Sequence, residues 1–224
     1  MVDYASAIKK PFEDMQTLLL GIIIGLVPFL NIFISGYSMG VGRNTLKGNN
    51  KMPKWDPNEL VQYIKDIIIG FVISLVYQIP AIIVGLVGAA ATITVVFDAV
   101  MQGNQEALIT GIIGALAAGG LFFTAAIILA VIGGALSLMG VMYYLKTGSI
   151  MSAFNIGGCV KKVLTVPFWS TVVVTFIYGF VLGVIATILS IVPIIGSLVG
   201  MGLATFLLAT TSNTMFAQVF KETK

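Results

Sequence analysis

The chain of 224 residues contains no histidine and a single cysteine, Cys159. Without histidine it has no imidazole metal site, no Ser/His/Asp triad and no histidine proton relay. One cysteine cannot form a disulfide within the chain or supply a thiolate metal site alone. We therefore interpret Cys159 as a small apolar residue at a packed position, and we expect no metal, no cofactor and no enzyme activity.

Charged residues are scarce as well, at 9% of the chain, whereas hydrophobic residues make up 58% and the mean hydropathy is +1.05. Soluble domains average about 25% charged and about 45–50% apolar residues. A surface that faces water cannot be built from so few polar side chains. The composition excludes a soluble globular protein, a disordered chain and a nucleic-acid-binding domain, and it indicates a single integral membrane domain over residues 1–224.

The positive charges are confined to four short stretches beside the apolar blocks. All 12 lysines and arginines lie within residues 9–10, 43–65, 146–162 and 221–224, whereas the loop 98–106 contains two acids and no base. Because cytoplasmic loops are enriched in lysine and arginine, we expect all four basic stretches and both termini to be cytoplasmic. The acidic loop is then external, and the protein is expected in the cell membrane as a multi-pass protein.

The apolar blocks predict an all-α, polytopic transmembrane bundle of about six spans. They cover residues 15–46, 66–97, 107–145 and 164–220. Both ends of each terminal block are expected to be cytoplasmic, so each of these blocks must cross twice. Each has a proline where the turn belongs, Pro28 and Pro193, because proline suits the first turn of a second helix. The end blocks then give helices at 12–27, 29–46, 166–191 and 194–220.

The two middle blocks are expected to cross once each, with helix breaks at Pro80 and Gly119–Gly120. An eight-span arrangement, in which both middle blocks are split and the acidic loop is inside, keeps the termini on the same side and stays open. Residues 1–15 carry charges throughout and lack the pattern of a signal peptide. We therefore expect the first apolar run to be a membrane anchor.

Two stretches about a hundred residues apart resemble each other and suggest an internal repeat, with halves at about 33–97 and 133–200. In each, a helix end is followed by Leu-Lys near a glycine, a short loop, an amphipathic segment and an apolar helix. If both copies begin on the cytoplasmic side, the repeat is parallel and its axis lies along the membrane normal.

Short amphipathic helices are expected on the cytoplasmic membrane surface. In the segment 56–59, with the sequence DPNE, Asp56 can cap a helix, proline suits the first position and Glu59 can reach back to the cap. The apolar residues that follow at helical spacing describe an interfacial helix, and Trp55 suits the headgroup layer. Similar surface segments are expected at the N-terminus and at 156–164.

Glycines spaced four residues apart occur in each terminal block. Such pairs let helix backbones approach closely, and we expect them to pack helices within one bundle or at a seam between subunits. The pairs are Gly21 and Gly25, Gly36 and Gly40, Gly179 and Gly183, and Gly196 and Gly200.

Two sets of polar residues are candidates for function. The neutral residues expected at membrane depth would either bond across helices or line a polar cavity. They are Asn31, Tyr37, Gln78, Thr205, Thr210 and Asn213. None is charged, which disfavours ion-coupled carriers and proton pumps. The second set, at the cytoplasmic end, is expected to bind lipid headgroups or to organise the following loop. It consists of Arg43, Asn44, Trp55 and Asp56.

The first third of the chain resembles a known family in a spaced set of residues. The set comprises Pro11-Phe12, Pro28, Asn31, Gly36-Tyr37, Arg43-Asn44, Gly48 and Pro53-x-Trp55-Asp56. With these residues the chain resembles a prokaryotic, largely archaeal membrane family called domain of unknown function 4013. The resemblance implies a small polytopic membrane protein and contributes no activity, catalytic residue or cofactor.

These features favour a non-catalytic membrane module that binds lipids or a partner. The alternative is a passive pore or facilitator for ions or small solutes, formed by an oligomer. That alternative is motivated by the repeat, the proline-broken helices and the polar residues of the last helix. Membrane lipids are the expected partners, a homo-oligomer is a second expectation, and no nucleic acid is expected.

Overall fold

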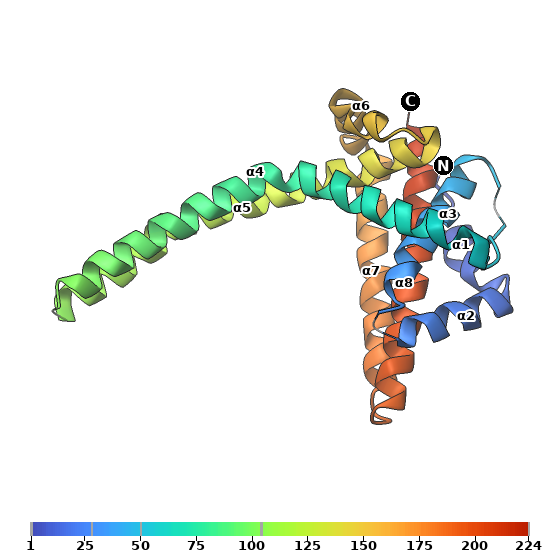
Figure 1. Ribbon diagram of the computed structural model, residues 1–224, viewed down its shortest axis with the longest axis horizontal. Helices are drawn as coiled ribbons and strands as arrows, with labels where there is room; N and C mark the ends of the chain where they lie inside the picture. Colours follow the sequence, from blue (N-terminus) through green and yellow to red (C-terminus); the bar gives the residue numbers. More distant parts are fainter. Residues whose placement is uncertain (1, 28, 50, 104, 224) are drawn as a thin grey trace. The chain divides into compact units, whose positions relative to one another are not determined.

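The computed structural model describes residues 2–27, 29–49, 51–103 and 105–223, and it is all-α over these residues (Figure 1). Its eight α-helices are α1 (Tyr4–Lys9), α2 (Met15–Leu26), α3 (Ile32–Leu46), α4 (Leu60–Met101), α5 (Gln105–Thr147), α6 (Ile156–Val163), α7 (Val166–Leu189) and α8 (Ile195–Glu222). Three short 3-10 helices, η1 to η3, cover Lys10–Phe12, Pro57–Glu59 and Ile150–Phe154. The predicted all-α class is confirmed.

The chain divides into two compact units. Unit 1 consists of Met1–Ile73 and Leu138–Lys224, and unit 2 consists of Ser74–Ser137. Unit 2 is a helical hairpin made of the second part of α4 and the first part of α5. All the other helices belong to unit 1. The single membrane domain expected from composition stays a prediction.

Within the described residues, four helical segments are long and apolar enough to cross a membrane. They are Pro57–Met101, Glu106–Thr147, Val166–Leu189 and Ile195–Glu222. The six-span prediction also needs α2 and α3 to cross, but these helices have only 12 and 15 residues. At about 1.5 Å per residue they are roughly 18 and 22 Å long, which is less than the roughly 30 Å of a hydrocarbon core. The four long helices indicate a multi-pass membrane protein.

Of the turns and helix breaks predicted at prolines and glycines, only some are present in the described residues. Pro193 lies between α7 and α8, in the turn expected there, whereas Pro28 lies outside the described residues. Pro80 is inside α4, which continues through it, and α5 continues through Gly119–Gly120. The breaks expected at these two positions are therefore absent. Helix interiors tolerate proline where neighbouring helices in an apolar setting re-satisfy the freed backbone groups.

Helix α8 is the central element of unit 1, where it packs against α2, α3 and α7 (Figure 1). Glycines allow the closest of these approaches. A Cβ added at Gly25 of α2 would lie 2.7 Å from Cα of Gly202 in α8, and one added at Gly200 would lie 2.9 Å from Cα of Ala186 in α7. At Gly183 of α7, by contrast, an added Cβ meets nothing within 4 Å. The Gly-xxx-Gly pattern thus marks close contacts within unit 1 at some pairs only.

The two ends of the chain meet at one end of unit 1. The backbone N–H of Asp3 donates to Oε1 of Gln218 at 2.8 Å, and the hydroxyls of Tyr4 and Thr171 are 3.2 Å apart. The N-terminal helix α1 therefore lies against α8 near its C-terminus (Figure 1). Both termini consequently lie on the same side of this unit.

Candidate functional site

The loop before α4 is held by the residues that the sequence marks there. Asp56 caps the helix start as predicted, because its Oδ1 accepts from the backbone N–H of Asn58 at 2.8 Å. Glu59 does not reach back but accepts from the hydroxyl of Tyr63 at 3.1 Å. The ring of Trp55 stacks on Tyr37 of α3, with centroids 4.1 Å apart. Trp55 and Asp56 therefore organise the loop, which is one of the two roles expected for them.

Arg43 forms a buried ion pair with Asp66, which lies in the first turns of α4. The Nη2 atom of Arg43 donates to both carboxylate oxygens of Asp66, at 2.7 and 2.8 Å. Tyr144 of α5 and Gln62 of α4 also donate to Oδ1, at 2.7 and 2.8 Å. Asp66 is 0% exposed, and a buried carboxylate is tolerated only when it is paired and hydrogen-bonded. This network joins α3, α4 and α5 in unit 1.

The partner of Arg43 was not identified from the sequence, because the amphipathic pattern of the first turns of α4 does not show what each face contacts. Their polar face, with Gln62 and Asp66, points into unit 1, while the apolar side chains of Ile64 and Ile68 are exposed. Lipid tails are as apolar as leucine, so an exposed apolar face is compatible with a membrane. The pattern itself was visible, but the direction in which each face points was not.

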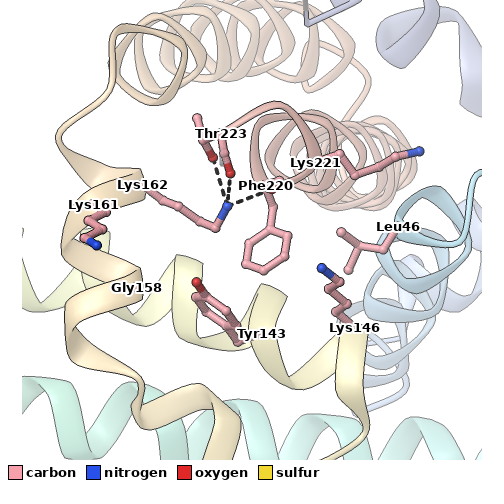
Figure 2. A pocket seen from close by; sticks show the side chains of 9 residues that line it. All are labelled: Leu46, Tyr143, Lys146, Gly158, Lys161, Lys162, Phe220, Lys221 and Thr223. Carbon is pink, nitrogen blue, oxygen red and sulfur yellow. Dashed lines mark hydrogen bonds between the residues drawn. The ribbon is translucent and has the colours of Figure 1, made fainter.

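Three adjoining cavities lie at this end of unit 1, and we call them A, B and C. Cavity A, of about 490 Å³, is lined by Lys146, Lys161, Lys162 and Lys221 and by the rings of Tyr143 and Phe220 (Figure 2). Cavity B, of about 460 Å³, is lined by Arg43, Lys47, Lys65 and Lys146 with Gln62 and Tyr144. Cavity C, of about 270 Å³, is lined by Arg43, Asn44, Lys47, Glu59, Gln62 and Tyr63.

These cavities gather cations from three of the four basic stretches of the chain. Of the 12 lysines and arginines, seven line at least one of them, and Glu59 is the one acid that does so among the described residues. The sequence showed the basic stretches, but we interpreted them as a topology signal alone. Folding brings α3, α4, α5, α6 and α8 together and turns the basic stretches into one cationic surface. Arg43 and Asn44 both line cavity C, and their predicted role in binding lipid headgroups stays a prediction.

The buried ammonium of Lys162 holds the end of α8. Its Nζ donates to the backbone oxygens of Phe220, at 2.9 Å, and of Thr223, and it lies 4.3 Å from the centre of the Phe220 ring (Figure 2). The last carbonyls of a helix lack partners within the helix, and a cation there is favourable. Burial lowers the pKa of Lys162, with repulsion from Lys146 as a smaller cause. Lys162 is thus a structural cation in cavity A.

The other ammonium groups of cavity A make fewer contacts with the protein than Lys162 does. Figure 2 shows Lys146 and Tyr143 of α5 directed toward the Phe220 ring, with Lys161 and Lys221 on opposite sides. Nζ of Lys146 is 5.5 Å from the ring centre, and Nζ of Lys221 donates to the backbone oxygen of Thr45 at 3.4 Å. Within the described residues, no carboxylate forms an ion pair with Lys146 or Lys161. Their charges are available to an anion.

Two members of the predicted polar-cavity set are buried inside unit 1. The hydroxyl of Tyr37 donates to the backbone oxygen of Pro53 at 2.6 Å, and that of Thr210 donates to the backbone oxygen of Phe206 at 2.7 Å. Tyr37 is in contact with the Phe206 ring at 5.9 Å between centroids. Both side chains therefore satisfy their hydrogen bonds within the protein.

The other members of this set do not gather at one place either. Asn213 of α8 donates to the hydroxyl of Ser38 in α3 at 3.1 Å. Gln78 belongs to unit 2, where it donates from α4 to the backbone oxygen of Ala130 in α5 at 3.1 Å. Asn31 and Thr205 are half-buried, as Asn213 and Gln78 are. In the part of the chain that the structure describes, none of the six lines cavity A, B or C; the first role expected for them, bonds across helices, is visible at Asn213 and Gln78.

A second buried lysine, Lys10 in η1, lines none of these three cavities. It is 2% exposed, and its Nζ donates to the hydroxyl of Thr45 at 2.8 Å. Burial lowers the pKa of Lys10 from 10.5 to about 8, an effect that the nearby charge of Glu13 partly offsets. The native state therefore carries a cation that is poorly compensated at neutral pH.

We expect stability to rise between about pH 8 and 10.5 because of Lys10. In this window the unfolded chain holds the proton and the folded chain has released it, so the slope of unfolding free energy against pH is positive. Below pH 8 both states are protonated and the cost is constant. The Lys10→Met variant should lose this slope and, at about 1.4 kcal/mol per pKa unit, gain at most about 3 kcal/mol at pH 7. Denaturant titration in detergent at several pH values measures this, with Lys9→Met as the exposed control.

The comparison with protein families supports the resemblance drawn from the first third of the sequence. The family described as protein of unknown function (DUF4013) matches residues 19–195, which include Arg43, Asp66 and Lys146. No curated protein and no solved structure matches the chain. The matched region reaches well beyond the first third and covers more than half of the chain. The chain therefore belongs to the DUF4013 family.

Proposed function

We propose that this protein is a non-catalytic, multi-pass membrane module that binds anionic lipid headgroups at the cationic end of unit 1. The observation that carries the proposal is the set of adjoining cavities A, B and C, which seven cations line. Lysine and arginine bind phosphate through charge-assisted hydrogen bonds. Basic pockets near the membrane surface are a recurrent means of holding anionic lipids.

The exposed apolar side chains next to cavity A support a lipid ligand. Helix α6 carries Lys161 and Lys162. Along the same helix and its C-cap, an exposed apolar stripe is formed at four-residue spacing by Ile156, Val160 and Leu164. A helix with an exposed apolar stripe and lysines beside it lies in the interfacial plane of a bilayer. In that position the lysines of cavity A are at the depth of the lipid phosphates.

The topology that we propose has α4, α5, α7 and α8 as spans. The six-span arrangement adds α2 and α3. Both four and six are even numbers of spans, so both arrangements leave the two termini on one side of the membrane. The contact of Asp3 with Gln218 agrees with this. We propose the cytoplasm as that side, because the cationic end of unit 1 carries most of the lysines and arginines. An internal repeat and a homo-oligomer stay predictions.

Exchange of lysines tests the proposal without disturbing the buried network. Arg43 is unsuited to this purpose, because its removal leaves Asp66 unpaired. We expect the double variant Lys47→Gln with Lys161→Gln to retain phosphatidylglycerol about 30-fold less strongly than the unmodified protein. Each basic residue near an anionic surface contributes about 1 kcal/mol, and about 1.4 kcal/mol corresponds to tenfold.

The measurement is native mass spectrometry of protein released from nanodiscs of phosphatidylglycerol and phosphatidylcholine. The matched control is Lys9→Gln with Lys51→Gln, which removes the same charge from exposed lysines that line none of the three cavities. The control should retain phosphatidylglycerol at nearly the original level. Equal losses in both double variants, or equal retention of the two lipids by the unmodified protein, would contradict the proposal.

A further inference from the structure

Cavities A and B share one lysine. Lys146, from the last turn of α5, lines both, and no other lysine or arginine is common to cavities A and B. No acidic side chain lines either cavity among the described residues. An anion in cavity A and a second anion in cavity B would therefore both be attracted by Lys146.

Each cavity has its own means of holding a phosphate. Cavity A offers Lys161 and Lys221 in addition to Lys162, whose ammonium is committed to the end of α8. Cavity B offers Lys47 and Lys65. Both volumes, about 490 and 460 Å³, lie within the range of about 300–1,000 Å³ that is usual for small-ligand sites. A headgroup with one phosphate would neutralise one cavity and leave the cations of the other unmatched.

Arg43 strengthens cavity B because its position is fixed. Only its Nη2 atom donates to Asp66, and Asp66 is held in turn by Tyr144 and Gln62. The guanidinium has five N–H donors in a rigid fork, and one nitrogen is engaged by the carboxylate. Arg43 is 21% exposed and lines cavity B, so the remaining donors are available to a ligand without a loss of side-chain freedom on binding.

We infer that cavities A and B together bind one lipid that carries two phosphates, with Lys146 between them. This inference rests on the proposed lipid-binding function and names the lipid class. A lipid is favoured over a soluble diphosphate because exposed apolar residues, Met151 and Leu164, lie in the same α5–α7 connection as Lys161. Such side chains offer acyl chains an apolar surface next to the cationic one. A second phosphate held by the same molecule binds at a high effective concentration, which multiplies the affinity of the first.

The experiment compares two nanodisc preparations of equal phosphate content in phosphatidylcholine, one with phosphatidylglycerol and one with cardiolipin. We expect the unmodified protein to retain cardiolipin at least about tenfold more strongly per phosphate, as avidity commonly adds a factor of about 100 or more. The Lys146→Gln variant should lower this ratio about fivefold, because cardiolipin loses the attraction of Lys146 for two phosphates and phosphatidylglycerol loses it for one, at about 1 kcal/mol each. Its ammonium contacts the Phe220 ring and is otherwise exposed, so the fold is expected to persist, which a thermal unfolding curve checks. The control Lys9→Gln should keep the ratio.

The outcomes separate this inference from the proposed function. Equal retention of both anionic lipids per phosphate, each above phosphatidylcholine, would overturn the two-phosphate inference and leave anionic lipid binding intact. A ratio that is unchanged in Lys146→Gln would also overturn it. No preference for either anionic lipid would overturn both. Full displacement of cardiolipin by inorganic diphosphate would assign the site to a soluble diphosphate and overturn the lipid assignment.

Discussion

The Asp66→Asn variant is expected to lose about 3 kcal/mol of unfolding free energy. The substitution keeps the shape of the side chain but removes the charge that Arg43 faces at 2.7 Å. Loss of one partner of a buried ion pair costs about 3–5 kcal/mol, because the other charge stays behind without compensation. We place the expectation at the lower end since Arg43 is 21% exposed and can be partly hydrated. Denaturant unfolding in detergent, followed by tryptophan fluorescence, measures the loss.

Two further variants show whether the loss comes from the ion pair. Glu59→Gln makes the same chemical change at an exposed acid that accepts from Tyr63 at 3.1 Å, and it should cost less than about 1 kcal/mol. Asp66→Asn combined with Arg43→Gln removes both charges and should recover part of the stability. If Asp66→Asn costs no more than Glu59→Gln, the network does not stabilise unit 1 as described.

The Gly25→Ala and Gly183→Ala variants are expected to change stability in opposite directions. At Gly25 the new Cβ would lie 2.7 Å from Cα and 3.0 Å from the carbonyl oxygen of Gly202. Backbone atoms cannot rotate away, so α2 must move off α8, at about 1–3 kcal/mol. At Gly183 nothing lies within 4 Å, and replacing a helix-interior glycine by alanine should add about 0.5–1 kcal/mol.

The pair of alanine variants controls for the chemical change itself. Both lie within helices of unit 1, and both replace glycine by alanine, so the environment of the new methyl group is the difference between them. Thermal unfolding in the same detergent gives both shifts. Shifts of the same sign and similar size would mean that the α2–α8 crossing is not as close as described. Gly25→Val should enlarge the effect at the crossing, while Gly183→Val should stay near neutral.

Features that depend on residues close together in the sequence were predictable. The helix cap at Asp56 and the turn near Pro193 are present where the local pattern indicates them. The breaks expected at Pro80 and Gly119–Gly120 were wrong, although the same reasoning about local conformation was used. A long apolar helix can keep a proline when its surroundings re-satisfy the backbone, and those surroundings are contributed by distant residues.

The candidate site shows more clearly which contacts cannot be predicted from local sequence patterns. Arg43 and Asn44 were selected from their position at a helix end, and both line the cationic cavities. The partner of Arg43 lies 23 residues away in Asp66, and Lys162 bonds to Thr223 over 61 residues. Helical periodicity assigns a residue to a face of its own helix, but it does not identify the element that the face meets.

The sequence by itself determined the class of this protein. Its 9% of charged residues and 58% of hydrophobic residues demand an apolar environment, and its long apolar runs demand helices. Only the tertiary structure decided which polar groups meet. Because lipid tails and a protein interior are equally apolar, hydropathy cannot tell a face that contacts lipid from one that contacts another helix. The packing of α3, α4, α5, α6 and α8 alone buries Asp66 and gathers the lysines around cavities A and B.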